Sequence, residues 1–240
     1  MIFDIHTHIL PDVDDGSKDA DETKRMLRVA SDEGIDAIVA TPHFTCGMSK
    51  KETQKRIQMY EIVRNWWKKQ EPDKELYLGN ELFYGESLVE ALEEGVALTM
   101  NGTKYVLVEF PIYAEFLYIQ KAVRTLQYAG YLPIIAHVER YENMQDRGKI
   151  QSLVDMGAYM QVNVSSVIGN HGMIAQHRII RYMKAGLIHF VASDAHGARV
   201  RRPEMQQCKA YLEKKIGERK TRRILEDNPE KMLKGEEIYG

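Results

Sequence analysis

Histidines and carboxylates gather in a few short motifs of this 240-residue sequence. The first is the H-T-H motif at residues 6–8, which directly follows the strand-like residues 2–5. Because side chains alternate along a strand, both imidazoles point to one side and would form half of a metal site. The acidic D-D-G loop at 14–16 can turn back over that site. A surface strand with two solvated histidines is the competing interpretation, and H-x-H alone would favour it.

Further metal-type ligands occur where the predicted strands of this chain end. A residue that could bind a metal follows six of the seven predicted strands. Ionisable residues directly after buried strands are normally paired or functional. Three histidines, His171, His177 and His189, lie away from strand ends and are interpreted as ordinary. The candidate ligands are His6, His8, Asp15, His43, Glu81, Glu109, His137, Asp194 and His196.

The candidate ligands are imidazoles and carboxylates, without a thiolate. Taken singly, Glu81 could be an acid at a helix N-terminus, Glu109 could pair with a lysine, and His137 could be a core histidine. Taken together, the set suits Mn²⁺, Fe²⁺ or Zn²⁺. Nine ligands exceed the needs of one metal, so we expect two or three metals that share a bridging carboxylate. Such clusters activate water at neutral pH and hold both the attacking and the leaving oxygen, which predicts a hydrolase.

Two arginines suggest that the substrate carries a phosphate. Arg140 belongs to the segment H-V-E-R-Y, and Arg201 lies seven residues after Asp194 in the segment R-V-R-R-P. Arginine binds phosphate oxygens in a bidentate manner and stays charged. The alternative is a solvated basic loop, which we adopt for Arg199 and Arg202. For Arg140 and Arg201 both interpretations remain open at this point.

Strands that alternate with helices must position these side chains. This alternation predicts a parallel sheet with right-handed crossovers, and in a parallel barrel functional residues sit at the carboxyl ends of the strands. Seven units without a linker predict a single α/β domain over residues 1–240, folded as a distorted (β/α)7 TIM-like barrel, with an open doubly wound sheet as the alternative. The predicted strands are 2–5, 35–40, 75–79, 105–108, 132–136, 159–163 and 188–192. The predicted helices are 17–33, with Ser17 as its cap, 49–70, 86–94, 114–129, 146–156, 173–185 and much of 203–240.

Composition excludes several other classes of protein. A net charge of -2 gives no sign of a nucleic-acid-binding face. Cys46 and Cys208 form no C-x-x-C pair, which fits a reducing compartment. Neither starts the C-x5-R loop of a cysteine-dependent phosphatase, because Glu52 and Lys214 stand where the arginine is needed. No apolar run could span a bilayer and the first strand leaves no room for a signal peptide, so a cytoplasmic protein is expected.

The motifs of this chain resemble those of the PHP (polymerase and histidinol phosphatase) superfamily. Within it, the sequence is similar to the metal-dependent protein tyrosine phosphatases of bacterial capsule and exopolysaccharide clusters. The long first motif and H-V-E-R-Y are the specific parts, whereas H-x-H and D-x-H occur in many metallohydrolases. In family order, the motifs are D-I-H-T-H-I-L-P-D-V-D-D-G at 4–16, A-T-P-H-F at 40–44, G-N-E at 79–81, V-E-F at 108–110, A-H-V-E-R-Y at 136–141, Q-V-N at 161–163 and A-S-D-A-H at 192–196.

The resemblance implies a distorted barrel with a three-metal cluster, usually of Mn²⁺. It implies phosphate contacts from Arg140 and Arg201, with Arg202 as an alternative to Arg201 and Asp14 as an alternative ligand to Asp15. The implied ligand groups are His6, His8, Glu81 and Asp194 for one metal, Glu81, Glu109 and His137 for the second, and Asp15, His43 and His196 for the third. The implied activity is hydrolysis of phosphotyrosine, on a bacterial tyrosine kinase that controls capsular or exopolysaccharide synthesis.

Two other functions compete with this interpretation. A small-molecule phosphatase such as histidinol-phosphate phosphatase represents the sister branch of the superfamily. The carboxylates at Asp15 and Glu109 favour the tyrosine phosphatase, because the sister branch tends to carry histidines there. A catalytically inactive, metal-stabilised binding module is the other possibility, and the complete ligand set argues against it.

Overall fold

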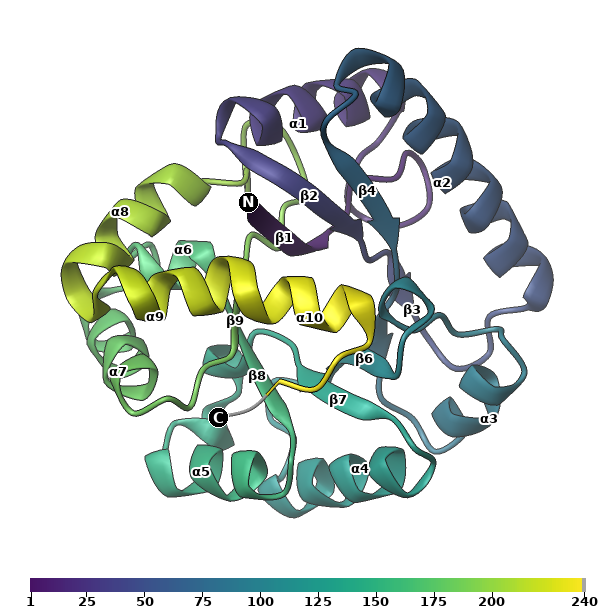
Figure 1. The fold of residues 1–240 in the computed structure, drawn as a ribbon. Coiled ribbons are helices and arrows are strands. Elements are labelled where there is room, and N and C mark those ends of the chain that lie inside the picture. Colours follow the sequence, from purple (N-terminus) through teal and green to yellow (C-terminus); the bar gives the residue numbers. More distant parts are fainter. Residues whose placement is uncertain (239–240) are drawn as a thin grey trace.

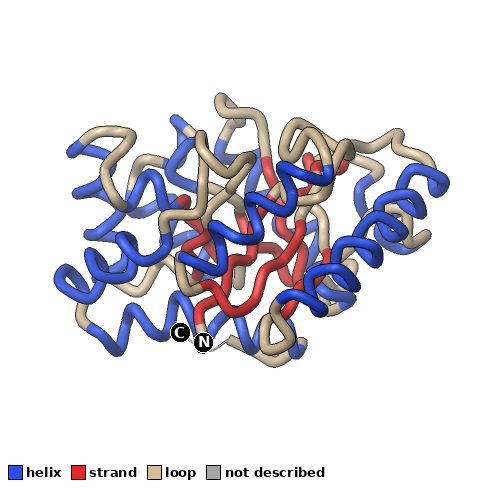
Figure 2. Tube along the Cα trace, turned by 90° about the horizontal axis from the view of Figure 1, so that it is seen from above, coloured by secondary structure: helices blue, strands red, loops and turns tan. Residues whose placement is uncertain are grey.

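Parallel strands occupy the centre of the molecule and helices surround them, as the computed structural model of residues 1–238 shows (Figure 1). Figure 2, turned by 90°, shows the strands enclosed between the helices. The strands are β1 (Ile2–Thr7), β2 (Ile35–Ala40), β3 (His43–Phe44), β4 (Glu75–Leu78), β5 (Glu81–Phe83), β6 (Tyr105–Glu109), β7 (Leu132–Ile135), β8 (Tyr159–Asn163) and β9 (Phe190–Ala192). The α-helices are α1 (Ala20–Asp32), α2 (Lys50–Gln70), α3 (Leu88–Glu93), α4 (Phe116–Tyr128), α5 (Arg147–Asp155), α6 (Val164–Val167), α7 (Met173–Lys184), α8 (Met205–Ile216), α9 (Glu218–Arg222) and α10 (Asn228–Lys234). Short helical turns are η1 (Met100–Gly102), η2 (Val138–Arg140) and η3 (Glu142–Met144), and the π-helical turn η4 (Arg223–Asp227) joins α9 to α10.

Neighbouring strands in the sheet are parallel, as the alternation of strands and helices predicts. One group pairs in the order β1-β2-β4, and the other in the order β3-β5-β6-β7-β8-β9. A parallel bridge between Thr7 and Ala195 joins the end of β1 to the segment that follows β9. The N–H of His8 also donates to the carbonyl oxygen of Ala195 at 2.9 Å. The sheet therefore curls until its first and last strands are neighbours.

Two of the predicted strands are each followed by a further short strand that begins at a predicted ligand. Thr41-Pro42 separates β2 from β3, because proline has no N–H to donate to the ladder. Gly79-Asn80 separates β4 from β5, and a Cβ atom on Gly79 would lie 2.9 Å from the sulfur of Met100. The prediction of an α/β fold with a parallel sheet is confirmed. The seven-stranded barrel stays a prediction.

The first helix begins later than predicted, so the prediction that Ser17 caps it is wrong. Asp19 is the N-cap, and its carboxylate accepts hydrogen bonds from the N–H groups of Asp21 and Glu22 at 2.9 and 2.7 Å. The Ser17 hydroxyl is buried and lies 2.7 Å from Oγ1 of Thr23. Ser17 is drawn inward because its N–H donates to the carbonyl oxygen of His8.

The other predicted helices are present with ends shifted by up to two residues. Several short elements were not among the predicted ones, namely α6, the strands β3 and β5, and the turns η1, η2 and η3. The predicted C-terminal helical region appears as α8, α9, η4 and α10, and its last two residues, 239 and 240, lie outside the described residues. Among the described helices none has both the length and the apolar character needed to cross a membrane.

The apolar core has two layers, one on each side of the curled sheet. The outer layer packs the strands against the surrounding helices. Along the strands, residues of the inner layer alternate with residues of the outer layer. The inner layer ends at α10, which lies across the amino ends of the strands (Figure 1). There the side chain of Asn228 donates to the carbonyl oxygen of His189. The inner layer contains Phe3, Ile5, Ala37, Val39, Met100, Tyr105, Leu107, Ile134, Ala136, Phe190, Ala192, Met232, Leu233 and Ile238. With the amino ends covered, the carboxyl ends are left for a functional site.

Candidate metal centre

The structure brings all nine predicted ligands together at the carboxyl ends of the strands. Three groups of them have side-chain donor atoms within 4.8 Å of one another. These groups are His8, Asp15, His43 and His196, then His6, His8 and Glu81, and then His43, Glu81 and Glu109. The two remaining residues contact the same groups, since Nε2 of His137 lies 2.7 Å from Glu81 and Oδ1 of Asp194 lies 3.6 Å from Nε2 of both His6 and His8.

A bulge in β1 aims the first two histidines into the site. Between Asp4 and Thr7 the strand has one residue more than its partner β2, because Asp4 pairs with Ile38 and Thr7 with Ala40. Bulges re-aim side chains and are frequent beside active sites. The Nε2 atoms of His6 and His8 come within 3.3 Å of each other, and both side chains are fully buried. The prediction that the two imidazoles point to one side is confirmed.

Glu81 lies at the centre of the cluster. Its Oε2 atom is 3.2 Å from Nε2 of His6 and 3.2 Å from Nε2 of His8. The same oxygen is 2.9 Å from Nδ1 of His43. Although it is buried, it has no hydrogen-bond partner among the described residues. Buried carboxylate oxygens are normally hydrogen-bonded, so an oxygen that three imidazoles surround in this way has the environment expected of a bridging metal ligand.

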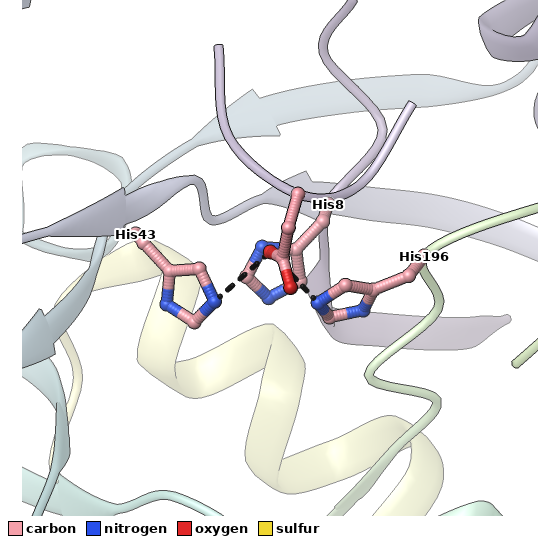
Figure 3. A group of neighbouring side chains, drawn as sticks. His8, His43 and His196 are labelled. Carbon is pink, nitrogen blue, oxygen red and sulfur yellow. Dashed lines mark ion pairs between the residues drawn. The ribbon is translucent and has the colours of Figure 1, made fainter. Parts of the chain in front are cut away.

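The two adjacent aspartates of the D-D-G loop have different environments. The side chain of Asp14 is buried, and its Oδ2 atom lies 2.7 Å from Nδ1 of His8 and accepts a hydrogen bond from the N–H of His43 at 3.1 Å. Asp15 is exposed, and its Oδ1 atom lies 3.3 Å from Nε2 of both His43 and His196. Figure 3 shows the rings of His8, His43 and His196 directed toward a common point. This geometry favours Asp15 as the ligand and Asp14 as the residue that orients His8.

Glycine is required at the end of that loop. A Cβ atom on Gly16 would lie 2.2 Å from the carbonyl oxygen and 2.4 Å from the Cβ atom of His8. Such distances are far inside van der Waals contact. The loop can therefore fold back over His8 only because residue 16 lacks a side chain.

Two of the predicted ligands occupy strained backbone positions. His137 follows β7 with φ of 33°, and Asp194 follows β9 with φ of 53°. Residues other than glycine rarely adopt this left-handed region, at a cost of about 1–3 kcal/mol each. Such strain is common at functional sites, because the surrounding structure must impose it. Here it lets the chain leave each strand sharply while the side chain stays in the cluster.

The sixth predicted strand supplies no predicted ligand, but β8 orients the ligands of its neighbours. Oε1 of Gln161 accepts the N–H of His137 at 2.8 Å and lies 3.3 Å from Nδ1 of His6. The amide of Asn163 donates to Oδ2 of Asp194 at 2.8 Å. The two amides are joined by a hydrogen bond of 2.9 Å. Both residues belong to the Q-V-N motif at 161–163, and their role as positioning residues emerges from the pairing of β8 with β7 and β9.

Arg56 also holds the site together, although it belongs to the strongly charged helix α2. Its side chain is buried and donates to the carbonyl oxygens of His43 and Val13. These bonds fix the loop before Asp14 to the residue at the start of β3. Burial lowers the pKa of Arg56, but the guanidinium remains charged because its normal value is so high. The sequence alone gives no sign of this role, because an arginine among many charges looks like a solvated one.

Charge and burial act in opposite directions on the site histidines. Burial by itself lowers the pKa of His6, but the negative charges of Glu81 and Asp194 outweigh it and raise this pKa to about 9. For His43, burial is likewise outweighed by contacts with Glu109 and Glu81, which raise its pKa to about 11. The carboxylates thus stabilise positive charge on the groups next to them. A divalent metal would supply that charge and displace the protons.

The predicted arginines border this cluster in a cleft of about 550 Å³. Nη2 of Arg201 donates to Oδ2 of Asp194 at 2.8 Å, and Nη1 of Arg140 lies 3.8 Å from the same oxygen. Both guanidinium groups are nearly half exposed. Arg202 instead lies 3.8 Å from carboxylates of Glu33 and Glu204. This geometry favours Arg201 over Arg202 as the partner of Arg140 at an anion that reaches the metal centre.

Comparison with known proteins gives this cluster a biological context. The family model described as "Capsular polysaccharide synthesis, CpsB/CapC" matches residues 2–234. The chain is 33% identical over 238 residues to tyrosine-protein phosphatase CpsB of Streptococcus pneumoniae, with 97% of this chain and 98% of the relative covered. It is 34% identical over 240 residues to tyrosine-protein phosphatase YwqE of Bacillus subtilis (strain 168), with 99% and 94% covered.

Solved structures give the same result. A chain from the crystal structures of YwqE from Bacillus subtilis and CpsB from Streptococcus pneumoniae, described as unique metal-dependent tyrosine phosphatases, superposes with a TM-score of 0.89. The two sequences are 32% identical, and the match covers 99% of this chain and 96% of that one. The phosphotriesterase from Mycobacterium tuberculosis matches with a TM-score of 0.57 at 12% identity, over 99% of this chain and 95% of that one, which is a likeness of fold alone.

Proposed function

Because the chain belongs to the CpsB/CapC family of capsular polysaccharide synthesis, we propose that it is a metal-dependent protein-tyrosine phosphatase. The observation that carries this proposal is the environment of Glu81, whose buried Oε2 atom lies among three imidazoles without a hydrogen bond. The relatives that match nearly the full chain are named tyrosine-protein phosphatases. A small-molecule phosphatase, such as one for histidinol phosphate, has no support among these relatives.

The finer fold that we propose is a seven-stranded barrel. It follows if β2 with β3 and β4 with β5 are each counted as one interrupted strand. The ladder then runs from β1 through each strand in turn to β9, and the bridge between Thr7 and Ala195 closes it. In such a barrel the carboxyl ends surround one opening, which explains why ligands distant in the sequence meet.

Up to three metals are proposed for the cluster, with Mn²⁺ as the expected ion. The donor set of imidazole nitrogens and carboxylate oxygens fits Mn²⁺, Fe²⁺ and Zn²⁺. We assign the nine predicted ligands to the groups that the resemblance implies, with Glu81 shared between two of them. The short contacts of Glu81 with His6, His8 and His137 support that sharing. Asp14 and Gln161 would hold the rings of His8 and His6 from outside, as residues behind metal ligands commonly do.

The side chains of the cleft suggest how phosphotyrosine would be hydrolysed. When bound, the metals would polarise the phosphate and activate water for an in-line attack. Arg140 and Arg201 would bind phosphate oxygens and stabilise the charge that develops on them. The phenolate of tyrosine, with a pKa of about 10, is a fairly good leaving group. We therefore assign no dedicated general acid, since His43 and His196 are needed as ligands.

The substrate that we propose is a phosphotyrosine protein, specifically a bacterial tyrosine kinase of a capsule or exopolysaccharide pathway. The family description and the names of the relatives support this class of substrate. The exposure of Arg140 and Arg201 also fits a phosphate presented on a protein surface or tail.

The proposal is tested by metal analysis combined with two substrates. Protein purified without chelator is analysed for metals and assayed with a phosphotyrosine peptide and with histidinol phosphate. We expect bound metal, turnover of the peptide, and loss of activity on chelation that Mn²⁺ restores. Preference for histidinol phosphate would replace the proposed substrate class. Bound metal without turnover of any phosphoester would instead support an inactive binding module.

A further inference from the structure

The cleft beside the metal centre holds more positive charge than one phosphate needs. Four arginines line it, Arg140, Arg199, Arg201 and Arg202, against the two carboxylates of Asp194 and Glu204. Asp194 already contacts Arg140 and Arg201 and is a predicted ligand. The excess charge therefore belongs to the outer part of the cleft, where Arg199 and Arg202 lie.

These two outer arginines are separate from the metal cluster. In the part of the chain that the structure describes, neither makes an ion pair with a predicted ligand. Arg202 reaches Glu33 and Glu204 at 3.8 Å, which is a long and weak contact. No hydrogen bond or ion pair engages the side chain of Arg199 within residues 1–238. A phosphate held by Arg140 and Arg201 would leave Arg199 without an anionic partner and Arg202 with only its two long contacts.

The loop that carries the outer arginines is fixed in place. The N–H of His196 donates to the carbonyl oxygen of Arg201 at 3.0 Å and closes the loop. The N–H of Ala198 donates to Oε1 of Glu22 in α1 at 2.8 Å, which ties the loop to the helix behind it. Arg201 itself has a left-handed backbone, with φ of 52°. These contacts fix the backbone from which the guanidinium groups extend, so less of the loop has to be ordered when an anion binds.

The lining of the cleft also includes polar side chains that can add donors to the same anion. These are Ser165, Asn170 and His171. The N–H of Asn170 donates to the carbonyl oxygen of Ser165 at 2.9 Å, so this loop is ordered as well. Nε2 of His171 lies 3.3 Å from the Ser165 hydroxyl. The volume of about 550 Å³ falls within the range of small-molecule sites, roughly 300–1,000 Å³, and exceeds the needs of a single phosphate.

We propose that Arg199 and Arg202 form a second anion subsite, which binds a phosphate or carboxylate carried by the peptide next to the phosphotyrosine. This inference rests on the proposed function and narrows its substrate class to peptides with clustered negative charge. Arginine binds phosphate and carboxylate alike through paired N–H groups, and a phosphate, with a charge of about -1.5 to -2, gains more from two arginines. A doubly phosphorylated peptide is therefore the preferred occupant.

Three peptides of equal length test this subsite. The first has one phosphotyrosine with neutral neighbours, the second has a further phosphorylated residue nearby, and the third has glutamate at that position. With the metal-loaded enzyme we expect kcat/KM to rise in this order: neutral, glutamate, doubly phosphorylated. The gain should appear in KM and shrink as salt is added, because the subsite is exposed to solvent.

Variants of the outer arginines test whether these residues cause the higher kcat/KM on the negatively charged peptides. Arg199→Gln and the double variant Arg199→Gln/Arg202→Gln should reduce the preference for the doubly phosphorylated peptide about tenfold, while turnover of the neutral peptide is retained. Arg28→Gln is the matched control, because Arg28 is an exposed arginine on α1 that does not line the cleft. Equal losses on all peptides, or an unchanged preference in the double variant, would overturn the subsite. If wild-type enzyme hydrolysed none of the peptides, the proposed function would fail and the subsite with it.

Discussion

Nδ1 of His8 lies 2.7 Å from Oδ2 of Asp14, and this contact leaves Nε2 of His8 facing the other predicted ligands. A neutral imidazole binds metal through one nitrogen, and the partner of the other nitrogen fixes the tautomer. Asp14 thus determines which nitrogen of His8 is free to bind metal, whereas the neighbouring Asp15 contacts His43 and His196 directly. Replacing Asp14 and replacing Asp15 should therefore impair the metal centre in different ways.

We expect Asp14→Asn to weaken metal binding roughly 10–100-fold and to leave a folded protein, because His8 loses its charged partner. Metal titration followed by calorimetry or elemental analysis measures this effect. Asp12→Asn is the control, since Asp12 is an exposed residue of the same loop whose positive φ asparagine tolerates. Wild-type metal affinity in Asp14→Asn would contradict the assigned role.

Arg140→Ala and Arg201→Ala should lose activity while metal occupancy is unchanged. Each removes a charge-assisted phosphate contact, so kcat/KM should fall by about 2 kcal/mol or more of transition-state stabilisation. The measurement is turnover of phosphotyrosine peptide at subsaturating concentration, with metal content determined on the same sample. Wild-type turnover in Arg140→Ala would refute its role at the phosphate.

By contrast, His6→Ala and Asp194→Asn should lose metal and activity together. Both side chains are buried among the predicted ligands and contact each other at 3.6 Å. Elemental analysis and phosphotyrosine turnover are compared in each variant. A fully metallated and active His6→Ala protein would remove His6 from the metal centre.

Thiol alkylation should leave activity largely intact, whereas chelation should abolish it. Cys208 is fully buried, and burial raises the pKa of its thiol, so it is unreactive. Cys46 is half-buried and lies three residues from His43, so its alkylation can have a partial steric effect. The variant Cys46→Ser should abolish that effect. Complete inactivation at two alkylated cysteines with metals retained would contradict a metal-based mechanism.

His189 should make the protein less stable as the pH falls from about 6.5 to 4. Its side chain is buried away from the site, and burial together with the charge of Arg223 lowers its pKa to about 4. Between these values the unfolded state binds a proton that the folded state does not, so the free energy of unfolding falls by up to about 3 kcal/mol. Urea denaturation of wild type and His189→Gln across this range measures the difference. Parallel stability curves for the two proteins would count against this prediction.

The sequence predicted the position of the cluster well because parallel strands all point their carboxyl ends one way. Once His6, Glu81 and Asp194 were placed after strands, their meeting followed from fold geometry alone. The Ser17 cap failed for a tertiary reason, since a bond to the carbonyl oxygen of His8 holds its backbone before the helix begins. Local propensity could not anticipate that contact.

Roles that depend on contacts between helices and strands could not be predicted from the sequence. Asn163 orients Asp194 only because β8 and β9 are neighbours in register. Arg56 looked like one more charge on a solvated helix, yet it is buried against the backbone of His43. The strained φ of His137 leaves no mark in composition either. These features all require knowledge of which surface each element buries.

The contact between the ends of β1 and β9 makes the order of synthesis important. His6 is synthesised long before its neighbour Asp194, and His196 follows two residues after Asp194. A nascent or truncated chain that stops before Asp194 lacks both Asp194 and His196, two of the predicted ligands. Contacts over such separations also form late in folding, because closing long loops is slow. Metal retention would then report that a newly made chain has been extended past His196 and has folded.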